Sequence, residues 1–481
     1  MQWILLSHPA PTEKEQPMKD LLQSICDKAK QRGASFADAR VFESENTGIT
    51  RQDGRADKLN SGSSRGLGIR VLKNAAWGFA SVSDFDSDSA IAALDSAISM
   101  AEASATRSEE GCVAEMPGIQ REVKAIVEID PRTVSVERKM AALEGYEQAA
   151  LKVIGEKLAN SIVSYTDRAD RETICNTQGT YVRKESIRTI MHCMFVTREG
   201  NLLQKARSRV GEPVGFELIE KTKPENFTVK AANLAVSLLS AAPPPAGKFP
   251  VIFHPSITGL LTHEAIGHNA EADHILSGGS IIEGKLGEKI ASDLVTIIDD
   301  STIPGKWGSF DYDSEGTPGS RRVIVEKGVL KGYMHSLQTA AKMGVAPNGS
   351  ARAQSYASRP IIRMSNTFIE RGASSFDDLV KGIDLGIYLR GGEYGYVFSE
   401  RGQYTCHAGE AVMIRNGELA EQLRDVSVAG MTLETLNNID MISDDFEMNM
   451  PGMCGKDGQW MYVDNGGPHI RVKELVVGGQ A

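Results

Sequence analysis

The sequence predicts an α+β protein of two domains. The first half of the chain alternates amphipathic helical segments with short strand-like segments. After residue 248 glycine becomes frequent, and β-like runs alternate with turns, which is typical of a barrel or a sandwich. Residues 241–247 (AAPPPAG) cannot continue a helix and form a stiff connector. We therefore expect an N-terminal α/β domain with an antiparallel sheet over residues 18–242 and a mostly β C-terminal domain over residues 248–481.

In the N-terminal half, helical spacing of apolar residues alternates with runs bounded by turn residues. The expected helices are residues 18–32, a segment from Asp86 or Ser87 through Ala101, residues 136–154 and residues 227–238. The expected strands are residues 37–43, 68–72, 77–82, 161–167, 172–176 and 180–197. The sequence NTQG makes the turn between the last two strands. Residues before Met18 are expected to be an extension or a misassigned start that lies outside the fold.

In the C-terminal half, the clearest helix begins near Ile257 and carries the candidate metal site. The other recognisable elements are short strands. The expected strands are residues 294–298, 322–325, 361–364, 396–398 and 411–414. No internal repeat or heptad pattern is present in the sequence.

Composition and charge exclude several classes of function. The 481 residues are 41% apolar, and 63 acidic residues exceed 53 basic ones without a Lys/Arg block. The sequence therefore lacks the cluster of basic residues that proteins use to bind nucleic acid or anionic lipid. No segment approaches the roughly 20 apolar residues of a membrane helix, and the apolar stretch Trp3–Leu6 has no preceding basic residue. Six scattered cysteines suit reduced thiols, so we expect a cytoplasmic protein.

The residues from His263 to His274 hold the strongest chemical signal. Six ionisable groups fall within twelve residues of otherwise small or apolar character, which is costly to bury unless the groups are paired or metal-bound. His263 and His268 could bind one metal ion, and Glu264 could act as general base. Their spacing is five, so on an α-helix at about 100° per residue the histidines would stand roughly 140° apart. We therefore expect a π-bulge, or an end of the helix, at Gly267.

Two histidines require a third protein ligand, because catalytic zinc usually has three ligands and an open position. The local candidates are Glu271, Asp273 and His274; the remote candidates are His335, His407, Cys454 and His469. Cys454 lies in a glycine-rich segment expected to be a loop, and nearby Lys456 would favour its thiolate. Composition alone does not choose among these residues.

Several longer motifs resemble the TldD/PmbA family, which is also catalogued under the name modulator of DNA gyrase. The matching segments are 262–268 (THEAIGH) with Glu271 and Asp273, 310–318 (FDYDSEGTP), 328–332 (GVLKG), 363–367 (RMSNT), 453–459 (MCGKDGQ) and 466–471 (GGPHIR). The resemblance covers nearly the whole chain after Met18. Because both histidines and the late cysteine are present, the chain resembles TldD, the metal-carrying member, rather than its PmbA (TldE) partner.

The resemblance implies a zinc peptidase in which His263, His268 and Cys454 bind Zn²⁺ and Glu264 is the general base. It also implies a homodimer, or a heterodimer with a TldE-like subunit, that cuts unfolded peptides in extended form. No contact with nucleic acid or membrane is expected.

Other polar residues have more ordinary explanations. Glu271 and Asp273 are expected to orient a histidine, since metal-bound imidazoles usually donate their other N–H to a carboxylate. His469 fits a substrate contact and a structural role equally. Arg321, Arg322, Arg352 and Arg359 are expected on solvated or ion-paired faces.

Two alternative functions remain open. The first is a metal-free subunit that binds peptides or a partner. The second is thiol catalysis, with Cys454 as nucleophile and a histidine as base.

Overall fold

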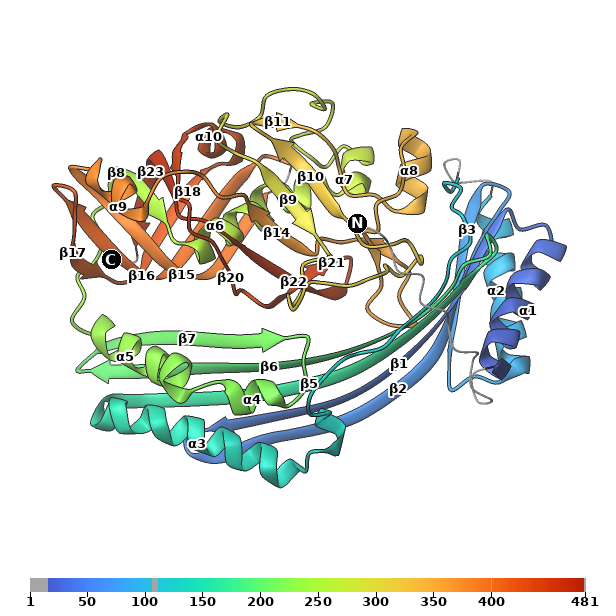
Figure 1. The fold of residues 1–481 in the computed structure, drawn as a ribbon, viewed down its shortest axis with the longest axis horizontal. Coiled ribbons are helices and arrows are strands. Elements are labelled where there is room, and N and C mark those ends of the chain that lie inside the picture. Colours follow the sequence, from blue (N-terminus) through green and yellow to red (C-terminus); the bar gives the residue numbers. More distant parts are fainter. Residues whose placement is uncertain (1–15, 106–110, 399, 480–481) are drawn as a thin grey trace.

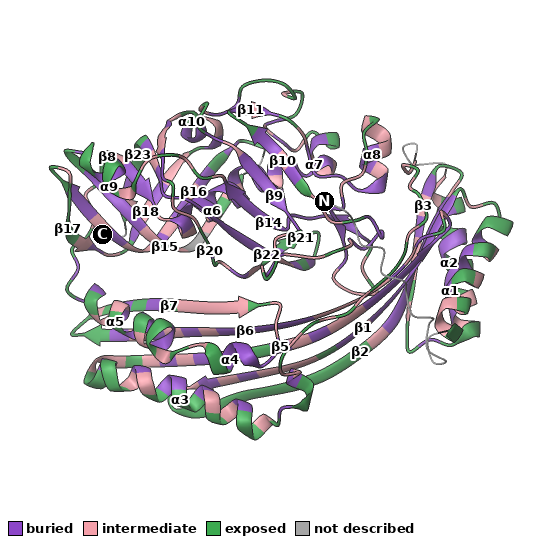
Figure 2. Ribbon diagram, in the orientation of Figure 1, coloured by how far each residue is buried: buried purple, intermediate pink, exposed green. Residues whose placement is uncertain are grey.

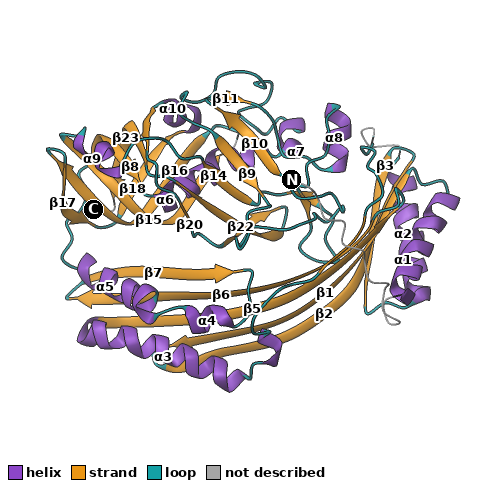
Figure 3. Cartoon of the chain, in the orientation of Figure 1, coloured by secondary structure: helices purple, strands orange, loops and turns teal. Residues whose placement is uncertain are grey.

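The computed structural model describes residues 16–105, 111–398 and 400–479, and it confirms the predicted α+β class (Figures 1 and 3). Residues 1–15, most of the expected extension, lie outside the described residues. A long curved sheet belongs to the N-terminal half, and shorter strands build the C-terminal half above it in Figure 1. The division of the chain into domains at residues 242–248 remains a prediction.

The N-terminal sheet has seven strands in the order β3-β2-β1-β5-β6-β4, with β7 paired to β6. Its pairs are antiparallel except for β4 with β6. The strands are β1 (Phe36–Gln52), β2 (Arg55–Lys73), β3 (Ala76–Ser83), β4 (Gln120–Val123), β5 (Leu158–Asn176), β6 (Tyr181–Glu199) and β7 (Leu202–Glu212). The expected turn at NTQG joins β5 to β6.

The central strands are much longer than expected. β5 is a single strand of 19 residues, so the prediction of two strands at 161–167 and 172–176 was wrong. In β2, residues 55–64 are exposed and polar (Figure 2), so they show no apolar alternation. The continuous pairing of β2 with β1 holds this part of the strand.

Five helices accompany the N-terminal sheet: α1 (Gln16–Gln31), α2 (Ser87–Ser104), α3 (Val136–Ile154), α4 (Glu217–Lys221) and α5 (Thr228–Leu238). Four of them were predicted; α4 was not. The Asp86 side chain accepts a hydrogen bond from Ser89 N and begins α2, as expected. α1 and α2 share one buried core with β1 and β2, while α3 and α5 share another with β5 and β6. Among the described residues, no helix is both long and apolar enough to cross a membrane.

The C-terminal half contains a closed five-stranded barrel, which confirms the expectation of a barrel or sandwich. Strands β15-β8-β23-β18-β16 form the ring, and β15 pairs with β16 to close it. A second sheet has the order β11-β10-β9-β14-β22-β20, with β21 paired to β22. The strands are β8 (Gly247–Phe253), β9 (Ile297–Asp300), β10 (Arg321–Glu326), β11 (Val329–Leu330), β12 (Ala351–Arg352), β13 (Ile361–Ile362), β14 (Asn366–Ile369), β15 (Leu385–Phe398), β16 (Gln403–Arg415), β17 (Glu418–Leu423), β18 (Val426–Met431), β19 (Ile439–Ile442), β20 (Glu447–Met448), β21 (Gly452–Lys456), β22 (Gln459–Gly467) and β23 (Ile470–Gly479).

Helix α6 (Pro255–Thr262) lies between the barrel and the second sheet, where it contacts β15 and β22. Its buried residues Ile257 and Leu261 join the largest core of the protein. His254 caps its N-terminus and Pro255 occupies the first turn, where proline is well tolerated. The remaining helices are α7 (Ala272–Leu276), α8 (Leu337–Met343), α9 (Phe376–Lys381) and α10 (Thr432–Asn437).

Basic side chains of the N-terminal sheet hold the segment 307–315 of the C-terminal half. Arg70 Nη2 lies 2.8 Å from Glu315 Oε1. Lys184 donates to the carbonyl oxygens of residues 312 and 313, and Arg188 donates to those of residues 307 and 309. Tyr312, Asp313 and Glu315 of the motif at residues 310–318 therefore take part in the contact between the two halves.

Candidate metal centre

A π-turn follows directly after α6. Residues His263–Gly267 have π-helical geometry, and the His268 N–H donates to the carbonyl oxygen of His263, five residues earlier. In this turn, residues five apart lie one above the other, as residues four apart do in an α-helix. The expectation of a distorted turn is therefore confirmed, and the distortion takes the π form. His268 then begins a short 3₁₀ turn.

Gly267 is required at this turn by a close neighbour. A Cβ atom at this position would lie 2.0 Å from Met364 Sδ. Met364 is fully buried, so it cannot move into solvent to make room. The glycine therefore allows the π-turn to pack directly against the segment that precedes β14.

We expect Gly267→Ala to destabilise the protein by about 1–3 kcal/mol, the usual cost of overpacking a core. Urea unfolding with a single transition would measure the change. Gly145→Ala in α3 is the matched control, because nothing lies within 4 Å of its added Cβ. That control should be neutral, or more stable by up to about 1 kcal/mol. Equal stability of the Gly267→Ala variant and the wild type would contradict the packing argument.

The structure brings His263, His268 and Cys454 together. One ligand atom from each lies within 4.8 Å of the others, a spacing suited to a metal ion. Cys454 Sγ is 3.3 Å from His268 Nε2, and the two imidazole rings stand nearly perpendicular with centroids 5.2 Å apart. Among the described residues, the buried Nδ1 of His263 has no hydrogen-bond partner. Such a donor set, two imidazoles and a thiol, fits zinc.

Cys454 lies on a strand, so the expectation of a loop was wrong. It belongs to β21, which forms a hairpin with β22 and pairs Cys454 with Met461. The turn of the hairpin uses Asp457 and Gly458, both with positive φ. Glycines that suggest a loop in the sequence therefore lie within a strand (Gly452 and Gly455) and in its turn (Gly458).

The electrostatics of Cys454 favour a thiolate. Burial opposes ionisation, but the neighbouring His263 and His268 lower the pKa of the thiol to about 4. Burial also opposes the charged forms of His263 and His268. The Cys454 thiolate and a nearby carboxylate, Glu264 for His263 and Glu271 for His268, outweigh burial, so the pKa of each histidine is raised. Lys456, which we expected to favour the thiolate, pairs with Glu271 and Asp273 instead.

Glu264 is half-buried and lies in the π-turn next to His263. Its charge raises the pKa of His263. Burial and, to a smaller extent, the charge of Glu264 raise the pKa of Cys406 to about 12. Cys406 lies on β16 of the barrel. The Glu264 carboxylate therefore acts electrostatically on both His263 and Cys406.

Glu271 orients His268, as predicted. Its Oε2 lies 3.2 Å from His268 Nδ1, which leaves Nε2 directed at Cys454. The carboxyl group is fully buried, and although burial opposes its charge, Lys456, His268 and Arg363 lower its pKa to about 2. The same expectation for Asp273 was wrong, because its carboxylate accepts hydrogen bonds from Lys456 Nζ and from the main chain of residue 274.

The remaining candidate histidines have other partners. His335 contacts Thr339, and His407 contacts Ser427. His469 lies between the Tyr388 hydroxyl at 2.8 Å and Asp445 Oδ2 at 2.6 Å. His274 groups with Glu271 and Asp273, apart from the cysteine.

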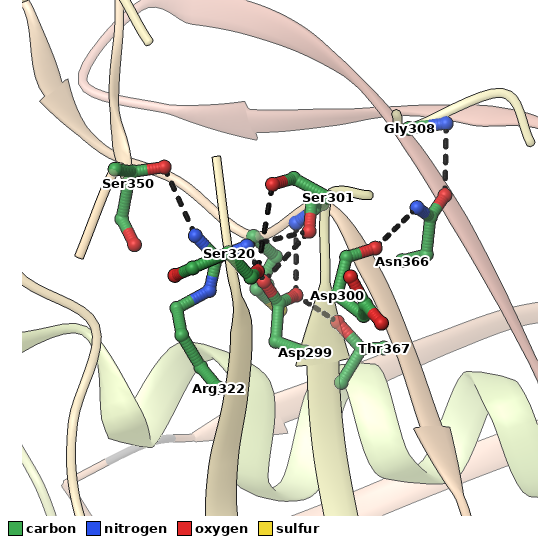
Figure 4. Close-up of polar contacts among 12 residues, drawn as sticks. Asp299, Asp300, Ser301, Gly308, Ser320, Arg322, Ser350, Asn366 and Thr367 are labelled. Carbon is green, nitrogen blue, oxygen red and sulfur yellow. Dashed lines mark hydrogen bonds and ion pairs between the residues drawn. The ribbon is translucent and has the colours of Figure 1, made fainter. Parts of the chain in front are cut away.

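Buried polar residues of the motif 363–367 support the centre. The Arg363 side chain is fully buried and donates to the carbonyl oxygens of Cys454 and Gln459, which fixes the hairpin. Asp299 on β9 accepts hydrogen bonds from Ser365, Thr367 and Arg322 (Figure 4). The sequence signalled Arg363, Ser365 and Thr367 only through the motif, and Asp299 was not signalled.

The prediction for Arg322 is confirmed, since its Nη2 lies 2.6 Å from Asp299 Oδ1 in a buried ion pair. The prediction for Arg352 was wrong: its side chain is buried, donates to the carbonyl oxygens of Met364 and Tyr462, and forms no ion pair with another described residue.

A cavity of about 630 Å³ lies beside the other face of the β21–β22 hairpin. Met453, Trp460 and Tyr462 line it from the hairpin, and Arg188 lines it from the N-terminal sheet. Side chains alternate across a strand, so Met453 faces this cavity while Cys454 faces the histidines. One hairpin thus separates the candidate centre from an open space between the two halves of the chain.

The sequence matches three family models: PmbA/TldA metallopeptidase domain 1 at residues 37–105, the central domain at 129–239 and the C-terminal domain at 246–479. The chain belongs to the PmbA/TldD family. Its TldD-type features are the two histidines and the late cysteine described above.

Relatives agree with this assignment. A Methanothermobacter thermautotrophicus protein named metalloprotease is 40% identical over 96% of this chain and 99% of its own length. A Saccharolobus solfataricus protein named zinc metalloprotease TldD homolog is 29% identical over 94% of this chain and 98% of its own length. The chain is therefore a metallopeptidase.

Solved structures share the PmbA/TldD fold. TldE from Thermococcus kodakarensis has a TM-score of 0.77 at 20% identity, covering 95% of this chain and 100% of its own. A Thermotoga maritima protein catalogued under the gyrase-modulator name has a TM-score of 0.77 at 23% identity, covering 96% of this chain and 100% of its own.

Proposed function

We propose that this metallopeptidase is a zinc-dependent enzyme that cleaves unfolded peptides, with His263, His268 and Cys454 as the zinc ligands. The observation that carries the proposal is the meeting of two imidazoles and a thiol of depressed pKa, all within 4.8 Å of one another. Three protein ligands are typical of catalytic zinc, which keeps a fourth position open. When bound, zinc supplies Lewis acidity toward the scissile carbonyl and makes water a better nucleophile.

Glu264 is the proposed general base. It accepts a proton from the attacking water and then donates that proton to the leaving amine. Its place directly after His263 in the π-turn keeps the carboxylate near the ligands without making it a ligand. Glu271 holds the His268 imidazole in orientation, with Nδ1 toward the carboxylate and Nε2 toward Cys454.

We propose unfolded polypeptide in extended form as the substrate. Binding through backbone hydrogen bonds gives affinity with little side-chain selectivity. The likeness to TldE supports assembly as a heterodimer with a TldE-like chain, or as a homodimer.

The proposed location is the cytoplasm. All six cysteines are free thiols, including Cys26 and Cys175, whose sulfur atoms lie 3.8 Å apart. Free thiols at this separation suit a reducing compartment.

Metal analysis with an activity assay tests the proposal. Protein purified without chelator or affinity metal should contain about one zinc per chain, as one catalytic site requires. A chelator should abolish cleavage of an unfolded polypeptide, such as reduced and alkylated lysozyme, and added Zn²⁺ should restore it. Native lysozyme should resist cleavage throughout.

A metal-free, folded protein that binds the unfolded polypeptide without cutting it would contradict the proposal. That result would favour the second candidate, a metal-free peptide-binding or partner subunit. The fold shared with TldE keeps this candidate open.

A further inference from the structure

Lys456 lies two residues beyond Cys454 on β21. Residues at this spacing on a strand point to the same face, so Lys456 follows Cys454 toward the centre. Its side chain is 5% exposed, which is unusual for lysine unless it is paired. Its Nζ lies 2.8 Å from both carboxylate oxygens of Asp273, 3.1 Å from Glu271 Oε2 and 3.3 Å from the carbonyl oxygen of Ile362.

Glu271 Oε2 is shared between two partners. The same oxygen that meets Lys456 lies 3.2 Å from His268 Nδ1. His268 Nε2 in turn lies 3.3 Å from Cys454 Sγ. Cys454 is therefore linked to Lys456 by the main chain of β21 and to His268 by the contact of its sulfur atom. Glu271 joins Lys456 to His268 and closes the ring.

The ammonium group of Lys456 supplies the cation that the carboxylates require. Glu271, Asp273 and His274 offer atoms within 4.8 Å of one another, a group that could otherwise hold a metal ion. Lys456 Nζ already lies at hydrogen-bond distance from both carboxylates of this group. A fully buried carboxylate such as Glu271 is costly without such a partner.

We propose that Lys456 is a positioning residue of the metal centre, acting through Glu271 on His268; this inference rests on the proposed zinc function. Lys456 fixes the Glu271 carboxylate at the place where it accepts the proton of His268 Nδ1. The imidazole then presents Nε2 to the metal and cannot rotate away. The contacts of Lys456 Nζ are with Asp273, Glu271 and the carbonyl oxygen of Ile362, so it acts on the ligands only through a carboxylate.

A double-mutant cycle tests this route. Zinc dissociation constants are measured by chelator competition for wild type, Lys456→Met, Glu271→Gln and the double variant. Each single change should weaken zinc binding by about 10- to 100-fold, the usual cost of losing a partner that orients a ligand. The double variant should bind zinc no more weakly than Glu271→Gln, because Lys456 acts only through that carboxylate.

Cobalt substitution gives a second readout. The sulfur-to-cobalt charge-transfer band should persist in Lys456→Met, since Cys454 remains a ligand. The ligand-field bands should shift, because the orientation of His268 changes. A purely structural role for Lys456 would lower stability and leave these bands unchanged.

Lys331→Met is the matched control, because Lys331 forms a largely exposed ion pair with Glu326. This variant should keep near-wild-type zinc affinity. If Lys456→Met fails to fold, Lys456→Gln, which also removes the charge, replaces it in the cycle, and the same non-additivity with Glu271→Gln is required.

Unchanged zinc affinity in the Lys456 variant, or additive losses in the cycle, would overturn the positioning role. Wild-type protein that binds no zinc would overturn the proposed function itself. The two failures are therefore distinguishable.

Discussion

Glu264→Gln should lower the rate of peptide cleavage by about 10²- to 10⁴-fold, the range that general acid–base groups contribute. Glutamine has nearly the same size as glutamate, but its amide cannot accept the proton of the attacking water at neutral pH. Zinc content should stay at the wild-type level, since Glu264 is not proposed as a ligand. Cleavage of a quenched fluorescent peptide and zinc content, measured on one sample, check both statements.

Glu283→Gln is the control for this change, because its exposed carboxylate lies nineteen residues beyond Glu264. That variant should cleave at the wild-type rate. Full activity of Glu264→Gln would refute the proposed base. Loss of zinc together with activity would instead make Glu264 a residue of the metal site.

Cys454→Ser should lose zinc under conditions in which the wild type retains it. A serine hydroxyl remains protonated near neutral pH and replaces a thiolate, a much better ligand for zinc. The loss of affinity should exceed the roughly 10- to 100-fold that removing a partner of a ligand costs. Zinc content after dialysis, together with cleavage of the same peptide, measures the effect.

Cys112→Ser is the matched control, since Cys112 lies in the N-terminal half and is only half-buried. It should keep zinc and activity. Zinc should also protect Cys454 from alkylation in the wild type. Activity that resists chelators but is abolished by alkylation of Cys454 would favour thiol catalysis instead.

Local patterns predicted the longer helices well, but they missed the short helices α4, α7, α8, α9 and α10. The segment 136–154 matches α3 at both ends, and Asp86 caps α2 as expected. Strand lengths were harder, because the exposed half of β2 shows no apolar alternation. Pairing with β1 keeps that segment in a strand, and this pairing is with another segment of the chain, so a local sequence pattern cannot predict it.

At the candidate site, chemistry predicted what lies close in sequence. His263, Glu264 and His268 belong to one turn, and their spacing alone required its distortion. Cys454 lies 186 positions away from His268, and only the family resemblance selected it from several remote candidates. The partners of Lys456 were missed for the same reason, since Asp273 is 183 positions away.

The π-turn has an effect beyond the two histidines. One residue inserted into a helix rotates everything after it by about 100° around the helix axis and advances it by about 1.5 Å. His268, the first residue after the π-turn, therefore takes a new rotational phase relative to α6. Glu271 reaches this imidazole from the end of the 3₁₀ turn that follows. A single extra residue thus sets the direction of the second histidine, which the carboxylate behind it then meets.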